Sequence, residues 1–272
     1  MDIVSSIFLG IIQGLTEFLP ISSSGHLVLF QNLLGFKEPA LFLDASLHLG
    51  TLIAVCLYFR NDLKKIMGRM QSFTTEVIRN QKSPGTIADD PDLSLALWIL
   101  AGTIPTGFIG IFFKSRLESM FDSVPLVGAM LLVTGLILAT TWFLSDGYCN
   151  RKNAGLITAL AVGFAQGLAI IPGISRSGAT IVCGMLLGMD REAAARFSFL
   201  LSIPAIIGAV ILQINSESLR MIGILPLLAG FISSVAVGLA ALKILMGLIR
   251  KGNISYFAPY CWAAGLLIIY IR

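Results

Sequence analysis

Long apolar stretches separated by short polar segments dominate this chain. Six of these stretches approach the length of about 20 residues that an α-helix needs to cross the hydrocarbon core of a bilayer. The pattern therefore predicts an all-α, polytopic membrane protein with six spans, which run from Leu41 to Phe59, Ser94 to Phe113, Val124 to Leu144, Phe197 to Leu212, Ile222 to Met246 and Phe257 to Tyr270.

Two further apolar segments, about Ser5 to Leu34 and Leu156 to Leu187, are interrupted by glycine, proline and runs of serine. This pattern favours re-entrant helical hairpins over full spans. Non-helical backbone at membrane depth is tolerated only where protein or a water-filled cavity satisfies its polar groups. A polar site is therefore expected at the tip of each hairpin.

Composition supports a membrane location, since 56% of the residues are apolar and 12% are charged. Soluble domains carry roughly 25% charged residues. The segment from Met1 to Leu19 lacks a basic n-region and is expected to belong to the mature protein. No basic cluster is interleaved with aromatic residues, so no nucleic-acid partner is expected. Four cysteines without metal-like spacing are expected to be buried thiols, namely Cys56, Cys149, Cys183 and Cys261.

The chain contains a near-copy of its own hairpin motif. The segment from Gly10 to Leu15 returns at Gly163 to Leu168, and Ile21 to Gly25 returns at Ile174 to Gly178, in each case 153 positions later. Each copy is followed by three predicted spans, and an odd number places the two halves upside down to each other. The sequence thus predicts one membrane domain built as an inverted repeat, with halves at residues 1–150 and 151–272.

The distribution of lysine and arginine gives the orientation. If the loop from Arg60 to Pro91 is cytoplasmic, thirteen basic residues lie on that side and five on the other, which agrees with the positive-inside rule and places both termini outside. The cytoplasmic set is Arg60, Lys64, Lys65, Arg69, Arg79, Lys82, Arg151, Lys152, Arg191, Arg196, Lys243, Arg250 and Lys251. The outer set is Lys37, Lys114, Arg116, Arg220 and Arg272.

The first hairpin carries an acid, hydroxyls and a histidine. Glu17 lies in an apolar run, where an ionised carboxylate is costly unless it meets a cation, a metal or water. After Pro20, the serines Ser22, Ser23 and Ser24 offer hydroxyls and backbone amides at a helix start, which suits an anion or a helix cap. His26 lies three residues after Ser23 and so on the same helix face, from which it can exchange a proton or attack phosphorus.

The second hairpin carries a single arginine at its turn, Arg176, among the hydroxyls of Ser175, Ser177 and Thr180. A guanidinium among hydroxyl donors suits a phosphate or diphosphate. The alternative is a buried ion pair of Arg176 with Glu17 that holds the halves together. Both readings are compatible in the empty protein.

Asp44 and His48 lie four residues apart on the first predicted span. Asp44 with Glu17 would form a hard oxygen site for Mg²⁺ or Ca²⁺. For His48 a hydrogen-bonded supporting role is favoured over catalysis.

At these residues the chain closely resembles the undecaprenyl-diphosphatase family, bacterial integral membrane enzymes also called bacitracin-resistance proteins. Gln13 to Glu17 fits the family motif of glutamate or glutamine, three residues and glutamate, and Pro172 to Thr180 fits its Pro-Gly-x-Ser-Arg-Ser-x-x-Thr motif. Ser22 to His26 and Phe197 to Leu201 extend the resemblance. Many members have glutamate where this chain has Gln13, so Asp44 becomes the candidate for the missing charge.

The resemblance implies hydrolysis of undecaprenyl diphosphate to the monophosphate and inorganic phosphate, with a divalent cation, in the bacterial inner membrane. The carrier lipid would then be recycled for cell-wall synthesis. Ser23 would attack the terminal phosphorus with Glu17 or His26 as base, or His26 would attack with Ser23 as a phosphate ligand. The phosphoryl oxygens would be held by Arg176 and by hydroxyls of both hairpins, with Gln13 and His48 in support.

An alternative from another class is a secondary transporter or flippase of a phosphorylated prenyl lipid or a small anion, since such proteins share the inverted-repeat plan. The reactive set of Glu17, Ser23 and His26 favours the enzyme. Small residues from Gly230 to Gly238 could pack spans within one chain or between the two chains of a homodimer.

Overall fold

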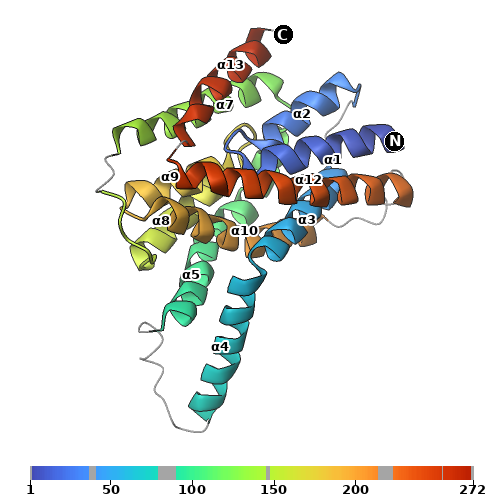
Figure 1. Ribbon diagram of the computed structural model, residues 1–272. Helices are drawn as coiled ribbons and strands as arrows, with labels where there is room; N and C mark the ends of the chain where they lie inside the picture. Colours follow the sequence, from blue (N-terminus) through green and yellow to red (C-terminus); the bar gives the residue numbers. More distant parts are fainter. Residues whose placement is uncertain are drawn as a thin grey trace.

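The computed structural model describes residues 2–36, 41–78, 90–144, 148–213, 223–252 and 254–270, and all of its regular elements there are helices. The elements are α1 (Ile3–Phe18), α2 (Ser23–Leu33), α3 (Leu41–Tyr58), α4 (Arg60–Ile78), α5 (Pro91–Phe112), α6 (Lys114–Met120), α7 (Val124–Ala139), η2 (Thr140–Phe143), α8 (Leu156–Leu168), α9 (Arg176–Leu186), α10 (Arg191–Gln213), α12 (Ile224–Arg250), η3 (Ile254–Tyr256) and α13 (Phe257–Tyr270) (Figure 1). The predicted all-α class is confirmed. The span start Ile222 and the basic residues Lys37, Arg79, Lys82, Arg220 and Arg272 lie outside the described residues.

The predicted spans are present as helices, with differences in length. Within the described residues, α5, α7 with η2, α10 and α12 are each long and apolar enough to cross a bilayer. Helices α3 and α4 are long and apolar enough to cross a bilayer only when taken together, and they are bent by 75° at the break between them. Helix α13 has 14 residues and therefore rises about 21 Å, less than the roughly 30 Å of a hydrocarbon core. The chain is a multi-pass membrane protein whose last apolar helix is shorter than a full span.

The polar segment after Arg60 is more ordered than the sequence suggested. Its first part is the 19-residue helix α4, which projects away from the other helices in Figure 1. The expected loop is therefore helical over these residues, since α4 has few helix breakers and one buried apolar residue, Ile66. At its base it packs against α5.

Each predicted hairpin consists of two short helices that contact each other, α1 with α2 and α8 with α9. Helices α2 and α9 begin at Ser23 and Arg176, 153 positions apart, like the motif itself. The preceding serines cap them: Ser22 Oγ accepts from the Gly25 amide at 3.3 Å, and Ser175 Oγ accepts from the Gly178 amide at 3.1 Å. A side-chain oxygen at this position satisfies an amide that the helix leaves free.

The halves are interlocked, because the first helix of each hairpin packs on a span of the other half. Helix α1 lies along α12, α8 lies against α5, and α7 pairs with α13 (Figure 1). This exchange of partners is what a repeat of two halves would produce. The inverted orientation of the halves stays a prediction.

Small residues on α12 serve contacts within the chain. A Cβ added to Gly230 would lie 2.9 Å from Leu47 Cδ2, and one added to Gly238 would lie 3.0 Å from Phe18 Cε2. These glycines therefore let α1 and α3 approach α12 closely. The pattern that suggested a homodimer is accounted for by packing inside one chain.

The outer surface of the helices is apolar, as contact with lipid requires. On α5, for example, Leu100 is 60% and Ile104 is 69% exposed. The buried core includes Phe18, Phe197 and Phe199, where the first hairpin meets α10. All four cysteines are free, with Cys261 buried and the other three partly buried.

Candidate active site between the two hairpins

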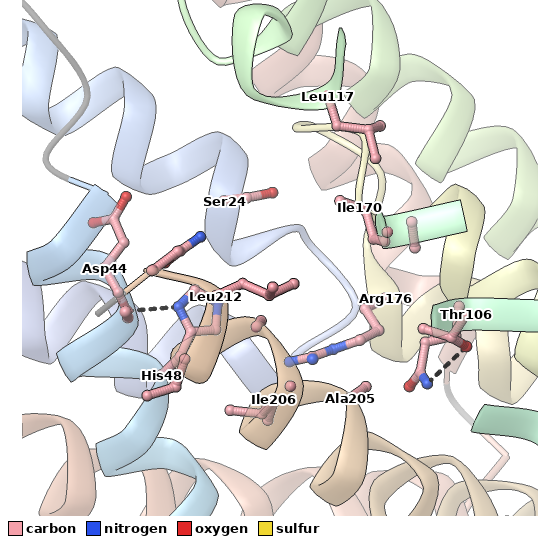
Figure 2. Close-up of a pocket in the computed structure, with 18 of the residues that line it drawn as sticks. Ser24, Asp44, His48, Thr106, Leu117, Ile170, Arg176, Ala205, Ile206 and Leu212 are labelled. Carbon is pink, nitrogen blue, oxygen red and sulfur yellow. Dashed lines mark hydrogen bonds between the residues drawn. The ribbon is translucent and has the colours of Figure 1, made fainter. Parts of the chain in front are cut away.

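A cavity of about 340 Å³ lies between the hairpin tips and helices α3, α5 and α10. In Figure 2, Asp44 and His48 face it from α3, Ser24 from α2 and Ile206 from α10, while Arg176 extends into it from the opposite wall. Its polar and charged lining is drawn from both halves and comprises Glu17, Ser23, Ser24, Asp44, His48, Thr103, Thr106, Lys114, Glu118, Gln166, Ser175, Arg176 and Gln213.

Glu17 is the centre of the polar end of this cavity. Its carboxylate is ion-paired with Arg176 and accepts hydrogen bonds from Gln13 Nε2 at 2.9 Å and Ser23 Oγ at 2.6 Å. The residue is only 7% exposed. A buried carboxylate is tolerated when donors and an opposite charge replace its water. The cross-half ion pair proposed from the sequence is present.

Ser23 is placed by a sharp break in the backbone. Helix α1 ends at Phe18, and Ser22 takes a φ of +67°, the only positive φ of a non-glycine residue in the described parts of the chain. Such a conformation costs roughly 1–3 kcal/mol and concentrates at functional sites. It turns the chain so that α2 starts with Ser23 Oγ donating to Glu17. A hydroxyl bonded to a carboxylate is the arrangement of a nucleophile and its base.

His48 and Asp44 approach the same cavity from α3. His48 Nδ1 donates to the Asp44 carbonyl at 2.7 Å, and His48 Nε2 lies 3.5 Å from Glu17 Oε2. The Asp44 carboxylate accepts from Gln31 Nε2 at 2.6 Å. His48 is thus held with one ring nitrogen toward the Glu17 carboxylate.

The predicted cation site of Glu17 and Asp44 is not formed by this arrangement. Glu17 is occupied by three donors, and Asp44 is bonded to Gln31 instead. The described residues contain no group of three or more His, Cys, Asp and Glu side chains arranged to hold a metal. These side chains therefore do not fit a resident divalent cation as they stand.

His26 lies behind the loop rather than in the cavity. Its Nδ1 is 2.7 Å from the Ser22 carbonyl, and its Nε2 is 2.8 Å from the hydroxyl of Tyr260 on α13. It is buried and is not part of the cavity wall. The helix face shared with Ser23 therefore did not bring His26 to the cavity, because the ring turns toward α13.

The predicted phosphate ligands divide into two groups. Ser24, Ser175 and Arg176 line the cavity, whereas Ser22, Ser177 and Thr180 lie behind it. Thr180 Oγ1 donates to the Arg176 carbonyl at 2.7 Å, and Ser177 Oγ is 3.2 Å from Ser175 Oγ. The second group supports the turn that presents the first.

Comparisons with known proteins identify the family of this chain. The model of the family described as "Bacitracin resistance protein BacA" matches residues 6–267. An undecaprenyl-diphosphatase of Desulfatibacillum aliphaticivorans is 48% identical over 97% of this chain and 96% of its own length. Those of Halothermothrix orenii and Methanosphaera stadtmanae are 46% and 44% identical, each over 99% of this chain and 98% of the relative. The chain belongs to this family. The resemblance stated from the motifs is thereby confirmed.

In this family member, several residues at the cavity were not found by sequence reasoning. Gln166 and Thr106 also line the cavity, with Gln166 Nε2 donating to Thr106 Oγ1 at 3.2 Å, and Figure 2 shows Thr106 on the side of Arg176 away from Asp44 and His48. The repeat itself held a signal for Gln166, which is the counterpart of Gln13. Gln31 and Tyr260 had no such signal, because only packing brings them to Asp44 and His26.

Proposed function

We propose that this chain hydrolyses undecaprenyl diphosphate to undecaprenyl phosphate and inorganic phosphate. The observation that carries the proposal is the contact of Ser23 and Arg176 with one carboxylate, Glu17, at the polar end of a membrane cavity. The relatives described above carry the name of this activity.

The cavity suits a lipid diphosphate because its lining combines polar and apolar side chains. The hairpin tips contribute hydroxyls and a guanidinium, whereas α5 and α10 contribute apolar side chains that include Ile111, Ile206 and Leu212. The diphosphate would lie between the tips, with the prenyl chain against the apolar wall. A charged headgroup can then react without its tail leaving the membrane.

Ser23 would act as the nucleophile. Its oxygen attacks the terminal phosphorus, its proton passes to Glu17, and undecaprenyl phosphate leaves with the bridging oxygen. Water then attacks the phosphorylated serine, which releases inorganic phosphate and returns a proton to Ser23. His48 Nε2, 3.5 Å from Glu17 Oε2, would share the proton that Glu17 takes up.

Arg176 would change partners when the substrate binds. In the empty cavity it is paired with Glu17. A diphosphate offers the guanidinium a stronger anionic partner, with two oxygens in matching geometry. Substrate binding would thus release Glu17 for catalysis while Arg176, Ser175 and Ser24 hold the phosphoryl oxygens.

A divalent cation would enter with the diphosphate, because Mg²⁺ in particular is commonly held by substrate phosphates with few protein ligands. The side chains here do not form a resident cation site. Of the predicted pair of ligands, Asp44 is the one that faces the cavity without contacting Arg176 or Ser23.

The membrane is proposed to be the bacterial inner membrane, with both termini and the cavity mouth on the outer side. The excess of lysine and arginine on the other side supports this orientation. A homodimer stays a prediction with no surface assigned to it.

The direct test is release of inorganic phosphate from undecaprenyl diphosphate by the purified protein in detergent. We expect release by the wild type, loss of at least about a hundredfold in Arg176→Ala, and little change in the surface control Arg250→Ala. Chelation should lower release, and added Mg²⁺ or Ca²⁺ should restore it.

Two results would contradict the proposal. One is a folded wild-type protein that releases no phosphate with the ion supplied. The other is movement of the intact lipid across proteoliposome membranes without cleavage, which would favour the transporter class.

A further inference from the structure

The tip of the second hairpin is held by α7, a helix of the first half. Thr134 Oγ1 donates to the Gly173 carbonyl at 2.8 Å and accepts from the Ser175 amide at 3.0 Å. Thr134 is 1% exposed. Gly173 has a φ of +98°, and a Cβ added to it would lie 2.7 Å from the Cβ of Met130. One hydroxyl thus fixes the backbone on both sides of the turn that leads into Arg176.

The tip of the first hairpin is held by α13, a helix of the second half. Tyr260 lies 2.8 Å from His26 Nε2, with the two rings stacked at 5.9 Å and 8°. His26 Nδ1 in turn contacts the Ser22 carbonyl at 2.7 Å. Beside it, Cys261 Sγ donates to the Pro20 carbonyl at 3.5 Å. These contacts fix the backbone on the side of the turn that leads into Ser23.

Helices α7 and α13 also pack directly on each other. A Cβ added to Gly128 would lie 2.9 Å from the Gly265 carbonyl oxygen, and one added to Gly265 would lie 2.7 Å from the Gly128 carbonyl oxygen. Val127 on α7 reaches the first tip as well, since its Cγ1 is 3.2 Å from the Cβ position of Gly25. The two helices therefore form one unit that contacts both tips.

We propose that α7 and α13 form a brace that aligns the two catalytic turns, with Thr134 and Tyr260 as its positioning residues. The brace is crossed in its hydrogen bonds, because Thr134 and Tyr260 each bond the hairpin that belongs to the other half. This inference rests on the proposed function. Neither residue lines the cavity or touches Glu17, so each acts through the backbone of the turn it holds.

The alignment matters because the reacting groups come from different turns. Ser23 Oγ must stay 2.6 Å from Glu17 while Arg176 reaches the same cavity from the other hairpin. A misplacement of 1 Å can lower a rate about a hundredfold. Thr134 orders the arginine turn, which binds phosphate, and Tyr260 orders the serine turn, which supplies the nucleophile.

The brace also assigns a tautomer to His26. A carbonyl oxygen only accepts, so Nδ1 carries the hydrogen, and in the neutral ring Nε2 accepts from the Tyr260 hydroxyl. This histidine then holds the turn and takes no proton from the reaction. The assignment follows from the hydrogen-bond partners and is open to direct spectroscopy.

Kinetics of four variants and two controls test the brace. We expect Tyr260→Phe to lower kcat about tenfold with KM within twofold, because it disturbs the nucleophile and not the phosphate ligands. Thr134→Val should lower kcat and also raise KM several-fold, and Thr134→Ser should restore most of both, since it keeps the hydroxyl. Tyr260→Leu removes the stacked ring together with the hydroxyl and should match Tyr260→Phe in KM. Tyr256→Phe and Thr140→Val are the matched controls, because Tyr256 is 72% exposed and Thr140 bonds only its own helix turn at Ile137.

A second measurement is independent of activity. The chain has two histidines, so ¹⁵N-histidine labelling yields two sets of ring signals, and His48→Gln identifies those of His26. We expect the His26 signals to report a hydrogen on Nδ1 and to shift in Tyr260→Phe, with the His48 signals unchanged.

The outcomes separate this inference from the proposed function. Wild-type kinetics and His26 signals that are unaltered in Tyr260→Phe overturn the brace while leaving the enzyme intact. A uniform loss of activity in all variants and controls, without a difference in KM between Thr134→Val and Tyr260→Phe, also overturns it. An inactive wild type contradicts the proposed function. In that case the response of the His26 signals to Tyr260→Phe alone tests the brace.

Discussion

Glu17 is buried inside the protein with a full set of partners, because donors from separate elements converge on it. Gln13 comes from the same helix, Ser23 from the start of the next, and Arg176 from the other half. Removing one partner of a buried ion pair leaves an uncompensated charge, which is strongly destabilising. Stability and activity are therefore coupled at this residue.

Loss of the Ser23 hydroxyl should abolish catalysis without unfolding the protein. Ser23 is partly buried, and Ser23→Ala removes the proposed nucleophile while Gln13 and Arg176 still contact Glu17. We expect phosphate release to fall by at least about 10³-fold, with an unchanged melting temperature. Ser24→Ala is the matched control, since Ser24 lines the cavity without bonding Glu17, and it should lose less than tenfold. Equal losses in the two variants would remove Ser23 from the role of nucleophile.

At the scale of elements, the contact of α1 with α12 sets the position of Glu17. Gly14 lies one turn before Glu17, and a Cβ added there would be 2.8 Å from the Gly238 amide nitrogen and 3.0 Å from the Ser234 carbonyl oxygen. Both neighbours are backbone atoms, which do not move aside easily. The helices can therefore meet only where both lack side chains.

Gly14→Ala should for this reason lower both activity and stability, although alanine normally stabilises a helix by roughly 0.5–1 kcal/mol relative to glycine. We expect the melting temperature in detergent to fall by several degrees and phosphate release to fall about tenfold or more. Gly247→Ala on α12 is the matched control, because no atom lies within 4 Å of its added Cβ. A gain of stability in both variants would contradict the close approach.

Where α4 meets α5, an ion pair is expected to make the stability of the protein depend on pH. Arg69 is ion-paired with Asp90, and this hydrogen bond lowers the pKa of Asp90 below its ordinary value of 3.8. Asp90 also caps α5 by accepting from the amides of Asp92 and Leu93 at 3.0 and 3.1 Å. Because the pKa is lower in the folded state, the stabilisation is present above about pH 4 and is lost as the pH falls through the folded value.

Asp90→Ala should lower the melting temperature by about 2 °C at pH 7, and the difference from wild type should shrink toward pH 3. Asp90→Asn is the informative comparison, because asparagine keeps the cap but not the charge. It should retain most of the stability and lose the dependence on pH. If the difference in melting temperature between Asp90→Ala and wild type grew at low pH, the result would contradict the stabilisation by this ion pair.

At the scale of the whole molecule, the interlocked halves mean that neither half contains a complete site. The acid and the nucleophile lie in residues 1–150, and the arginine lies in residues 151–272. The brace of α7 and α13 crosses in the same sense. The cavity therefore exists only when both halves are folded together.

The orientation of the molecule in the membrane can be measured with single cysteines. In a variant without native cysteines, Asp2→Cys should react with a membrane-impermeant maleimide in intact cells, and Lys64→Cys on α4 should react only after the cells are opened. Both positions are exposed. The reverse pattern would place the termini in the cytoplasm and contradict the positive-inside assignment.

Most of the fold could be predicted from the sequence, because apolar length and the duplicated motif are local signals. The helix start near Ser23 followed from the run of serines, and the span positions followed from hydropathy. Helix α4 was not predicted, because a polar helix has no long apolar run that would distinguish it from a loop. The short α13 has the predicted bounds, yet it does not reach the length of a span.

The sequence by itself determined the class and the family, and it named Glu17, Ser23 and Arg176 as candidate site residues, since these depend on composition and on motifs that are continuous in the chain. Only the tertiary structure decided which side chains meet. It turned His26 toward Tyr260, brought His48 to Glu17 and bonded Asp44 to Gln31. The physical reason is that side-chain direction and the choice of hydrogen-bond partner depend on neighbours distant in sequence, which spacing along one helix does not specify.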